Sequence, residues 1–336
     1  MKRAAAIYIL SLLGVTSSAV AQTKTGTTIG QFVGIGASAR IAAMGNAGAG
    51  IGEGVQTVYY NPGVIGATSG TSIQFTHGFW FADISYDYAA ALLPAGDIGN
   101  FFLSVTALNS GDIAVRTVSQ PLGTGENYSV QAVALGVGYG RQITDRFAAG
   151  LQVHYLNESI WNSSVDVWTA SIGTSYRLSD GGAILGASLL NFGTKGSYDG
   201  RDLAIQYDAD PDRYGDNSSL PANQYTDEFP VPVLFRVGLS YPTRLSESST
   251  LLLTADAGHP SDNTEFLSLG WEWKWKDALA IRAGYENLAQ QDSELGLTAG
   301  LGIRGGLGPR KFEFDYAWGY HLTLQETHRL TFVLVL

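Results

Sequence analysis

Fourteen segments of this chain, all after Gly70, alternate between large apolar residues and small or polar ones. The alternation is clearest in residues 131–140, 265–275 and 311–320, where every second residue is a large aliphatic or aromatic one. A period of two places the large residues on one face of a β-strand. The chain is therefore expected to be all-β, with a strongly lipophilic face on its strands.

The opposite face of these strands carries small side chains. It carries repeated glycine, alanine and serine rather than the lysine, glutamate and threonine of a solvated sheet. Only 15% of the residues are charged, whereas 42 are glycine and 11% are aromatic, a balance that is poor in charge for a soluble protein. We expect a 14-stranded antiparallel transmembrane β-barrel with a crowded lumen, in which scattered charges pair. The charges expected in the lumen are Asp87, Arg236, Asp256, Glu272, Arg282, Glu286, Arg304, Glu313, Asp315 and Arg329.

Connection lengths support the barrel. The predicted strands cover residues 71–76, 83–93, 98–108, 130–141, 146–156, 165–177, 183–192, 231–241, 250–257, 265–275, 279–285, 295–304, 311–320 and 327–336. Bacterial barrels have short periplasmic turns and longer outer loops. With the amino terminus in the periplasm, every second connection is short, and the two longest, 109–129 and 193–230, both fall in the outer set. An even number of strands returns the carboxyl end to the periplasm, and the terminal strand alternates to Leu336.

Residues 30–66 differ from everything downstream. Glycine recurs every few positions, no alternation is present, and residues 38–44 predict two helical turns with Ser38 as N-cap and Gly45 as the stop. A helix that short is not stable alone. We expect the wall to enclose this block as a plug, or hatch.

The same block carries a family resemblance. The run F-x-G-I-G-x-x-A-R-x-A-A-M-G-x-A at 32–47, followed by Y-Y-N-P-G at 59–63, resembles the hatch of the PorV/PorQ proteins, a branch of the FadL-like outer-membrane barrels. The similarity continues through HGFWFADISYDY, NFGTKGSYDGRDL, FPVPVLFRVGLSY, DAGHPSDNTEFLSLGWEW and HRLTFVLVL. Gly63 stands where the family usually has alanine. The candidate hatch residues are Gly34, Gly36, Arg40, Met44, Gly45, Asn61 and Pro62.

The first residues are typical of an export signal. Lys2 and Arg3 precede a short apolar run, and the A-x-A site at 19–21 predicts cleavage before Gln22. The expected organisation is a signal peptide at 1–21, a leader and hatch at 22–69 and the barrel at 70–336. The expected location is the bacterial outer membrane, with its lipid as a partner.

Several classes of function lack support in the sequence. The net charge of -10 argues against nucleic acid as a partner, because phosphate binding needs a basic face. The chain has no cysteine, and its five histidines form no metal-binding motif. No nucleophile elbow is present. We therefore expect no enzyme, no metal site and no cofactor.

The loop at 193–230 is acidic and aromatic, and it is a candidate surface for a protein partner. A structureless loop of this length is more often functional than idle. Its candidate contact residues are Tyr198, Asp199, Tyr207, Asp208, Asp210, Tyr214 and Tyr225. The D-x-D-x-D spacing at 208–212 does not fit an EF-hand, because the glycine and glutamate are missing and Pro211 intervenes.

Two functions compete. Resemblance to PorV implies a component of type IX secretion, which would bind the translocon and deliver cargo carrying C-terminal signal domains. The alternative is FadL-like transport of hydrophobic small molecules, with a hydrophobic ligand or detergent in the lumen. Charges on the predicted lumen face and the long outer loops favour the first. Arg40 is expected to clamp the hatch to a carboxylate of the inner wall, for instance Asp87.

Overall fold

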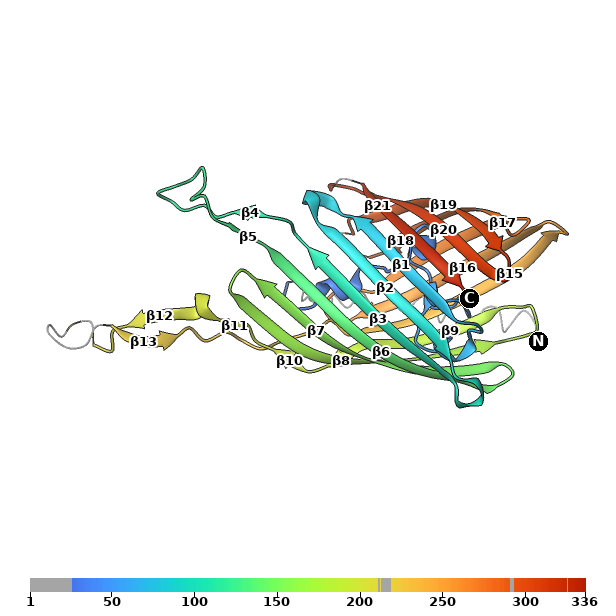
Figure 1. Ribbon diagram of the computed structural model, residues 1–336, viewed down its shortest axis with the longest axis horizontal. Coiled ribbons are helices and arrows are strands. Elements are labelled where there is room, and N and C mark those ends of the chain that lie inside the picture. The colour runs from blue at the N-terminus through green and yellow to red at the C-terminus, as the bar shows by residue number, and fades with distance from the viewer. Residues whose placement is uncertain (1–25, 211, 213–218, 291–292, 325) are drawn as a thin grey trace, which may run out of the picture.

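The computed structural model describes residues 26–210, 212, 219–290, 293–324 and 326–336 (Figure 1). The predicted signal peptide and its cleavage site before Gln22 lie outside this range. In the part of the chain that the structure describes, no helix is both long and apolar enough to cross a membrane.

Fourteen antiparallel strands form a closed wall, which confirms the predicted barrel (Figure 1). They are β1 (Ser72–Phe79), β2 (Ser85–Pro94), β3 (Asn100–Asn109), β6 (Val130–Thr144), β7 (Phe147–Ile160), β8 (Ser163–Arg177), β9 (Ile184–Gly193), β15 (Leu234–Ser246), β16 (Ser249–Pro260), β17 (Phe266–Trp275), β18 (Leu279–Leu288), β19 (Leu295–Leu307), β20 (Arg310–His321) and β21 (Thr327–Val335). The barrel closes where Ser72 of β1 pairs with Val335 of β21.

The two ends of the barrel differ in their connections. Short turns join β2 to β3, β6 to β7, β8 to β9, β15 to β16, β17 to β18 and β19 to β20 at one end. The long connections at 110–129 and 194–233 are at the other end. Because outer loops are the long ones in bacterial barrels, we assign this second end to the cell exterior.

The described part of the hatch lies in the lumen. It contains the one-turn elements η1 (Gln31–Gly34), α2 (Ala39–Ala42), η2 (Val55–Thr57) and α3 (Val64–Ala67). The hydroxyl of Ser38 accepts a hydrogen bond from the N–H of Ile41, so Ser38 caps α2 as predicted. Gly45 follows the helix with φ of 68°, a conformation that favours glycine. Ile41 and Met44 are completely buried.

The hatch runs from the outer end of the barrel to its periplasmic end. The N–H of Ile29 donates to the carbonyl of Pro230 at the outer end (3.1 Å). At the periplasmic end, the side-chain amide of Asn100 donates to the carbonyl of Ile65 (2.6 Å). The expectation of a periplasmic amino-terminal end is therefore wrong for the first described residues. Strand β1 nevertheless begins at the periplasmic end, as the alternation of short and long connections requires.

Burial along the strands identifies the two faces of the wall. Leu269 and Leu297 are 40% and 59% exposed on the outer surface, whereas Ser268 is 1% exposed and faces the lumen. Asp87 is on the outer surface, where its carboxylate lies 2.7 Å from Nδ1 of His77. The prediction that Asp87 faces the lumen is therefore wrong. The reason is the period of two, since the buried Tyr86 and Tyr88 occupy the inward positions beside it.

The outer loops contain short strand pairs that the sequence does not predict. One long connection carries β4 (Ile113–Ala114) and β5 (Asn127–Tyr128). The other holds β10 (Lys195–Gly196) paired with β14 (Phe229–Pro230), β11 (Asp199–Gly200) beside β8, and β12 (Ala204–Tyr207) paired with β13 (Leu220–Asn223). In Figure 1 the β12–β13 hairpin projects far beyond the wall. The expectation of a loop without secondary structure at 193–230 is therefore wrong. Three further one-turn elements, η3 (Phe81–Asp83), η4 (Gly96–Ile98) and η5 (Arg201–Leu203), lie in connections.

Candidate functional site

The lumen has a charged side and a neutral side. Away from the rims, the described inner faces of β15–β21, called the charged arc below, carry the imidazole of His321 and ten carboxylate or cationic side chains: Arg236, Asp256, Glu272, Lys274, Arg282, Glu286, Arg304, Glu313, Asp315 and Arg329. The described inner faces of β1–β9, called the neutral arc, carry away from the rims one carboxylate, that of Glu158, and the imidazole of His154, while Arg177 ends β8 at the periplasmic rim. The hatch therefore meets two chemically different walls.

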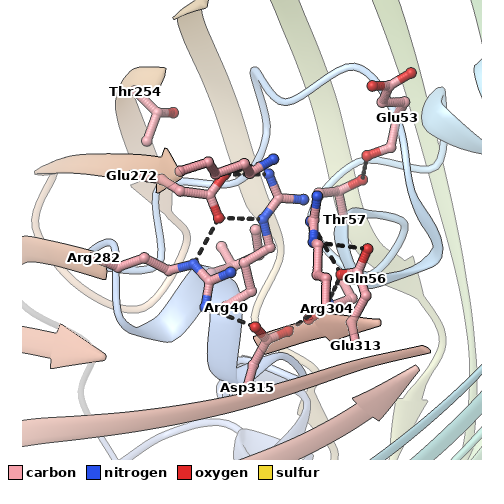
Figure 2. A network of polar contacts seen from close by, with 12 residues as sticks. Arg40, Glu53, Gln56, Thr57, Thr254, Glu272, Arg282, Arg304, Glu313 and Asp315 are labelled. Atoms are coloured by element: carbon pink, nitrogen blue, oxygen red, sulfur yellow. Dashed lines mark hydrogen bonds and ion pairs between the residues drawn. The ribbon is translucent and has the colours of Figure 1, made fainter. Parts of the chain in front are cut away.

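Arg40 holds the hatch to the charged arc (Figure 2). Its Nε and Nη2 donate to the two carboxylate oxygens of Glu272 at 2.9 and 2.8 Å. Glu272 also accepts from Arg282 (2.6 Å), which donates in turn to Asp315 (2.7 Å). The structure therefore contains the predicted clamp, but its partner is Glu272 and not Asp87.

A second hatch residue extends this network. The side-chain amide of Gln56 donates to Asp315 (2.8 Å) and to Glu313 (3.2 Å), and Glu313 also pairs with Arg304 (Figure 2). Glu272 and Asp315 are completely buried. Removing one member of a buried ion pair leaves an uncompensated charge, which typically costs about 3 to 5 kcal/mol. The charged arc is therefore a firm attachment for the hatch.

The Asn61–Pro62 turn attaches the hatch to the opposite wall near the periplasmic end. The amide of Asn61 donates to the carbonyls of Ala49 and Thr174, both at 2.9 Å. At Gly63, an added Cβ would lie 2.6 Å from the Cα of Thr174. Glycine at this position, instead of the alanine of the resembled family, therefore lets the turn rest directly on the backbone of β8.

The other predicted hatch residues have different surroundings. Met44 is buried, with its carbonyl close to the glycine backbone of β17, and the N–H of Gly45 donates to the hydroxyl of Thr298 (3.0 Å). Gly36 leaves room for the side chains of Asn46 and Tyr60, whereas a Cβ at Gly34 would meet nothing within 4 Å. Packing therefore requires glycine at 36 but not at 34.

On the neutral arc, two apolar clusters accompany hydrogen bonds from uncharged side chains, such as those that Gln74 and Thr76 donate to the carbonyl of Ala37 (2.7 and 2.9 Å). At the outer end, Ile29 and Phe32 of the hatch pack in one buried cluster with Leu156, Val165 and Val167 of the wall. Toward the periplasm, a second buried cluster joins hatch residues of η2 and α3 to inward side chains of β2 and β3; its members include Val58, Val64, Ile65, Tyr88, Leu92 and Phe102. The hatch therefore meets an apolar surface along much of this wall.

An aromatic cleft lies above the neutral arc at the outer end. It has a volume of about 830 Å³ and is lined by Ile113, Tyr128, Ile160, Trp161 and Tyr198, among others. The rings of Tyr128 and Trp161 are 6.0 Å apart. Tyr198 also packs against the outer apolar cluster, so the cleft and the lumen share a wall.

Tyr198 is the predicted loop residue that lies at this cleft. Its hydroxyl donates to Glu158 (3.2 Å), and its carbonyl accepts from the hydroxyl of Thr226 (2.6 Å). Partial burial, followed by the nearby Glu158 carboxylate, raises the pKa of Tyr198 above its ordinary value. The hydroxyl therefore stays protonated as a donor. Sequence reasoning missed Tyr128 and Trp161, because only their positions beside outer connections mark them.

The remaining predicted loop residues are elsewhere. Asp199 lies in β11 beside Ser164 of β8. Tyr207 ends β12, Asp208 and Asp210 follow it, and Tyr225 is 82% exposed. Tyr214 lies outside the described residues. Only Tyr198 of this set therefore contributes to the aromatic cleft.

Two further cavities lie along the hatch. One of about 30 Å³ is lined by Tyr59, Tyr88, His154 and Leu190, among others. A larger one of about 400 Å³ opens at the periplasmic end, where Val333 and Val335 meet Lys274 and Arg304. We call this larger cavity the periplasmic vestibule. No cluster of three or more His, Cys, Asp or Glu residues suited to a metal ion occurs in the described ranges.

Known structures share this architecture. The toluene transporter TodX of Pseudomonas putida is similar to this chain with a TM-score of 0.56 and 14% identity, over 89% of this chain and 97% of that one. The monoaromatic hydrocarbon channel CymD gives a TM-score of 0.53 at 13% identity, over 89% and 96%. A FadL homologue of Pseudomonas aeruginosa has a TM-score of 0.48 and 11% identity, over 86% of this chain and 94% of that one.

By sequence, the chain matches no family model and no curated protein. At such low identity the structural similarity concerns the fold alone, which is a closed 14-stranded antiparallel β-barrel like those of TodX and CymD. The comparisons give no support to the narrower PorV/PorQ assignment.

Proposed function

We propose that this FadL-like barrel carries small hydrophobic compounds across the bacterial outer membrane, without catalysis, after export with a cleaved signal peptide. The observation that carries the proposal is the pair of buried apolar clusters along the neutral arc, which follow one another from beneath the aromatic cleft toward the periplasmic end. The similarity of fold to channels named for toluene and for monoaromatic hydrocarbons supports it.

The route begins at the aromatic cleft. A neutral aromatic compound would pack between Tyr128, Trp161 and Tyr198, where stacking contributes about 0.5 to 1.5 kcal/mol per ring pair. Tyr198 also borders the outer apolar cluster of Ile29 and Phe32. The compound would leave the cleft beside Tyr198 and slide between the hatch and β6–β8.

The hatch closes this route in the described conformation, because the cavity between the two apolar clusters has only about 30 Å³. Passage therefore requires a shift of the hatch. The clamp of Arg40 and Glu272 would keep the hatch attached to the charged arc, while dispersion contacts on the neutral arc are the easier ones to exchange for a ligand. The proposed roles of Arg40, Met44, Asn61 and Pro62 are to retain the hatch during this shift.

The test is uptake of radiolabelled toluene by cells that express the protein. Trp161→Ala should lower the rate roughly three- to tenfold, because one wall of the cleft is lost. Val118→Ala, a fully exposed site in the neighbouring outer loop, is the matched control and should leave the rate unchanged. Uptake equal to that of cells without the protein would rule out the channel.

A second candidate function is protein binding by the distal hairpin, defined as residues 204–223. Its strands β12 and β13 form a two-stranded sheet of their own, away from the wall (Figure 1). Ile205, Tyr207 and Leu220 are exposed by 43%, 52% and 37%. An isolated two-stranded hairpin is only marginally stable in water, and a hydrocarbon route does not need one. These observations favour a protein partner, and the resemblance of the sequence to PorV implies the C-terminal signal domain of type IX cargo as the one to test.

The second candidate has its own test. Replacing residues 205–222 by a Gly-Ser turn should abolish binding of a purified C-terminal signal domain in surface plasmon resonance, while toluene uptake continues. Replacing residues 116–125 of the other outer loop is the control and should leave the binding intact. If the signal domain binds equally well without the distal hairpin, or does not bind the intact protein, this candidate fails.

A further inference from the structure

A cavity separate from the proposed route lies under the outer ends of β18–β21. It has a volume of about 140 Å³, and the hatch forms one side of it through Gly36 and Asn46. The wall contributes Glu286, His321 and Arg329, and Trp80 from the connection after β1 covers it. A single buried water needs only ~15 Å³ measured with a water-sized probe. The cavity therefore has room for a small solute.

Arg329 is a buried cation without a carboxylate in contact. The residue is 6% exposed, and its Nε has no hydrogen-bond partner. Within the described residues the guanidinium forms no ion pair; the ring of Trp80 lies 5.9 Å from it, and Glu286 acts on it only at longer range. Buried charges are normally paired directly, because the loss of hydration is otherwise poorly compensated. The Nε group of Arg329 therefore remains available to a ligand.

An acid on the same cavity is not in contact with a cation. Among the described residues, Glu286 accepts a hydrogen bond from the amide of Asn46 (2.6 Å) and interacts with Arg329 and Arg236 only at longer range. His321 is 4% exposed, and neither of its ring nitrogens is hydrogen-bonded. Arg236 is already in contact with Asp256 at 3.8 Å. One cavity therefore presents a cation and an acid that face the same space without a direct ion pair.

We propose that this cavity binds a small zwitterion, such as an α-amino acid. The ligand's carboxylate would accept hydrogen bonds from Arg329 and His321, and its ammonium group would donate to Glu286. A simple carboxylate would be repelled by Glu286, and a simple amine by Arg329. A hydrocarbon would leave both buried charges unpaired. This site does not depend on the hydrophobic route along the neutral arc.

Calorimetry on the purified full-length protein in detergent tests the ligand class. L-alanine is the zwitterionic probe, N-acetyl-L-alanine retains only the carboxylate, and L-alaninamide retains only the ammonium group. The expected result is that each half-blocked compound binds at least about tenfold more weakly than L-alanine, since each leaves one buried group unpaired. Equal binding of L-alanine and N-acetyl-L-alanine, or no binding of L-alanine, would overturn the proposal.

Variants locate the site. Arg329→Gln should abolish the preference for L-alanine over L-alaninamide, and Glu286→Gln should abolish its preference over N-acetyl-L-alanine. Arg304→Gln removes a similar wall charge at the periplasmic vestibule and should leave L-alanine binding unchanged. Because Arg329→Gln could prevent folding, Trp80→Ala provides a second probe that leaves the charged side chains in place. It should weaken the binding of L-alanine, because it enlarges the cavity. Unchanged binding in both Glu286→Gln and Trp80→Ala would place the ligand elsewhere.

Discussion

Gly63 and Gly34 show how differently two glycines of one hatch are constrained. A Cβ at Gly63 would lie 2.6 Å from the Cα of Thr174, whereas a Cβ at Gly34 would meet nothing within 4 Å. Gly63→Ala should therefore destabilise the protein by about 1 to 3 kcal/mol, the range for overpacking. Gly34→Ala should change the free energy of unfolding by no more than about 0.5 kcal/mol. Urea unfolding in lipid vesicles measures both, and equal effects would contradict the direct contact of the turn with β8.

Arg40 provides the second prediction at this scale. Arg40→Met removes the hatch's part of the clamp but leaves Glu272 with Arg282 and Lys274. We expect a folded barrel, destabilised by at most about 3 kcal/mol, with a hatch that moves more freely. Single-channel recordings should show more frequent openings than in the unaltered protein. Arg244→Met, at an exposed position near a periplasmic turn, is the control, and identical recordings for both variants would mean that the clamp does not restrain the hatch.

Residue roles were predictable from the sequence only where local spacing determines them. Ser38 and Gly45 were identified correctly, because a cap and a stop are set by neighbours in the chain. The clamp of Arg40 was expected because a lone cation in a small-residue helix needs a carboxylate. Its partner was not predictable, since Glu272 is brought near by the barrel and not by sequence distance.

At the scale of the element, each wall strand separates lipid from lumen. Leu269 lies in β17 with 40% exposure on the lipid side. Leu269→Arg should destabilise the barrel by about 2 to 4 kcal/mol if it lies near the bilayer midplane. Val118→Arg, in an outer loop, should change the free energy of unfolding only slightly. Folding titrations in lipid vesicles compare them, and a Leu269→Arg cost as small as that of Val118→Arg would put this part of β17 outside the hydrocarbon.

The fourteen wall strands are predictable from the sequence because each predicted segment alternates over six or more residues. The strand pairs in the outer loops are not, since two to four residues are too few to show a period. The prediction places Asp87 on the wrong face because it rests on the charge alone. The alternation of Tyr86 and Tyr88 around it is the stronger signal.

At the scale of the whole molecule, the aromatic cleft and the two arcs are products of closure. Tyr128, Trp161 and Tyr198 come from three different connections and meet only when β6, β7 and β8 are neighbours. The charged arc comes from the second half of the chain and the neutral arc from the first. The sequence shows both compositions, but without the closed wall a count of lumen charges suggests a uniformly polar interior. Such a count by itself favours secretion over transport of hydrophobic compounds.

The seam between β1 and β21 has a consequence for how the barrel forms. Ser72 and Val335 stand at opposite ends of the wall sequence, so their pairing closes the longest loop in the chain and the loss of entropy on closure is large. The N–H of Ala39 in the hatch donates to the hydroxyl of Thr331 in β21 (2.8 Å), and the hatch is joined covalently to β1. The hatch thus touches both edges of the seam, and we expect it to act as a folding template that brings the first and last strands together before the ring closes.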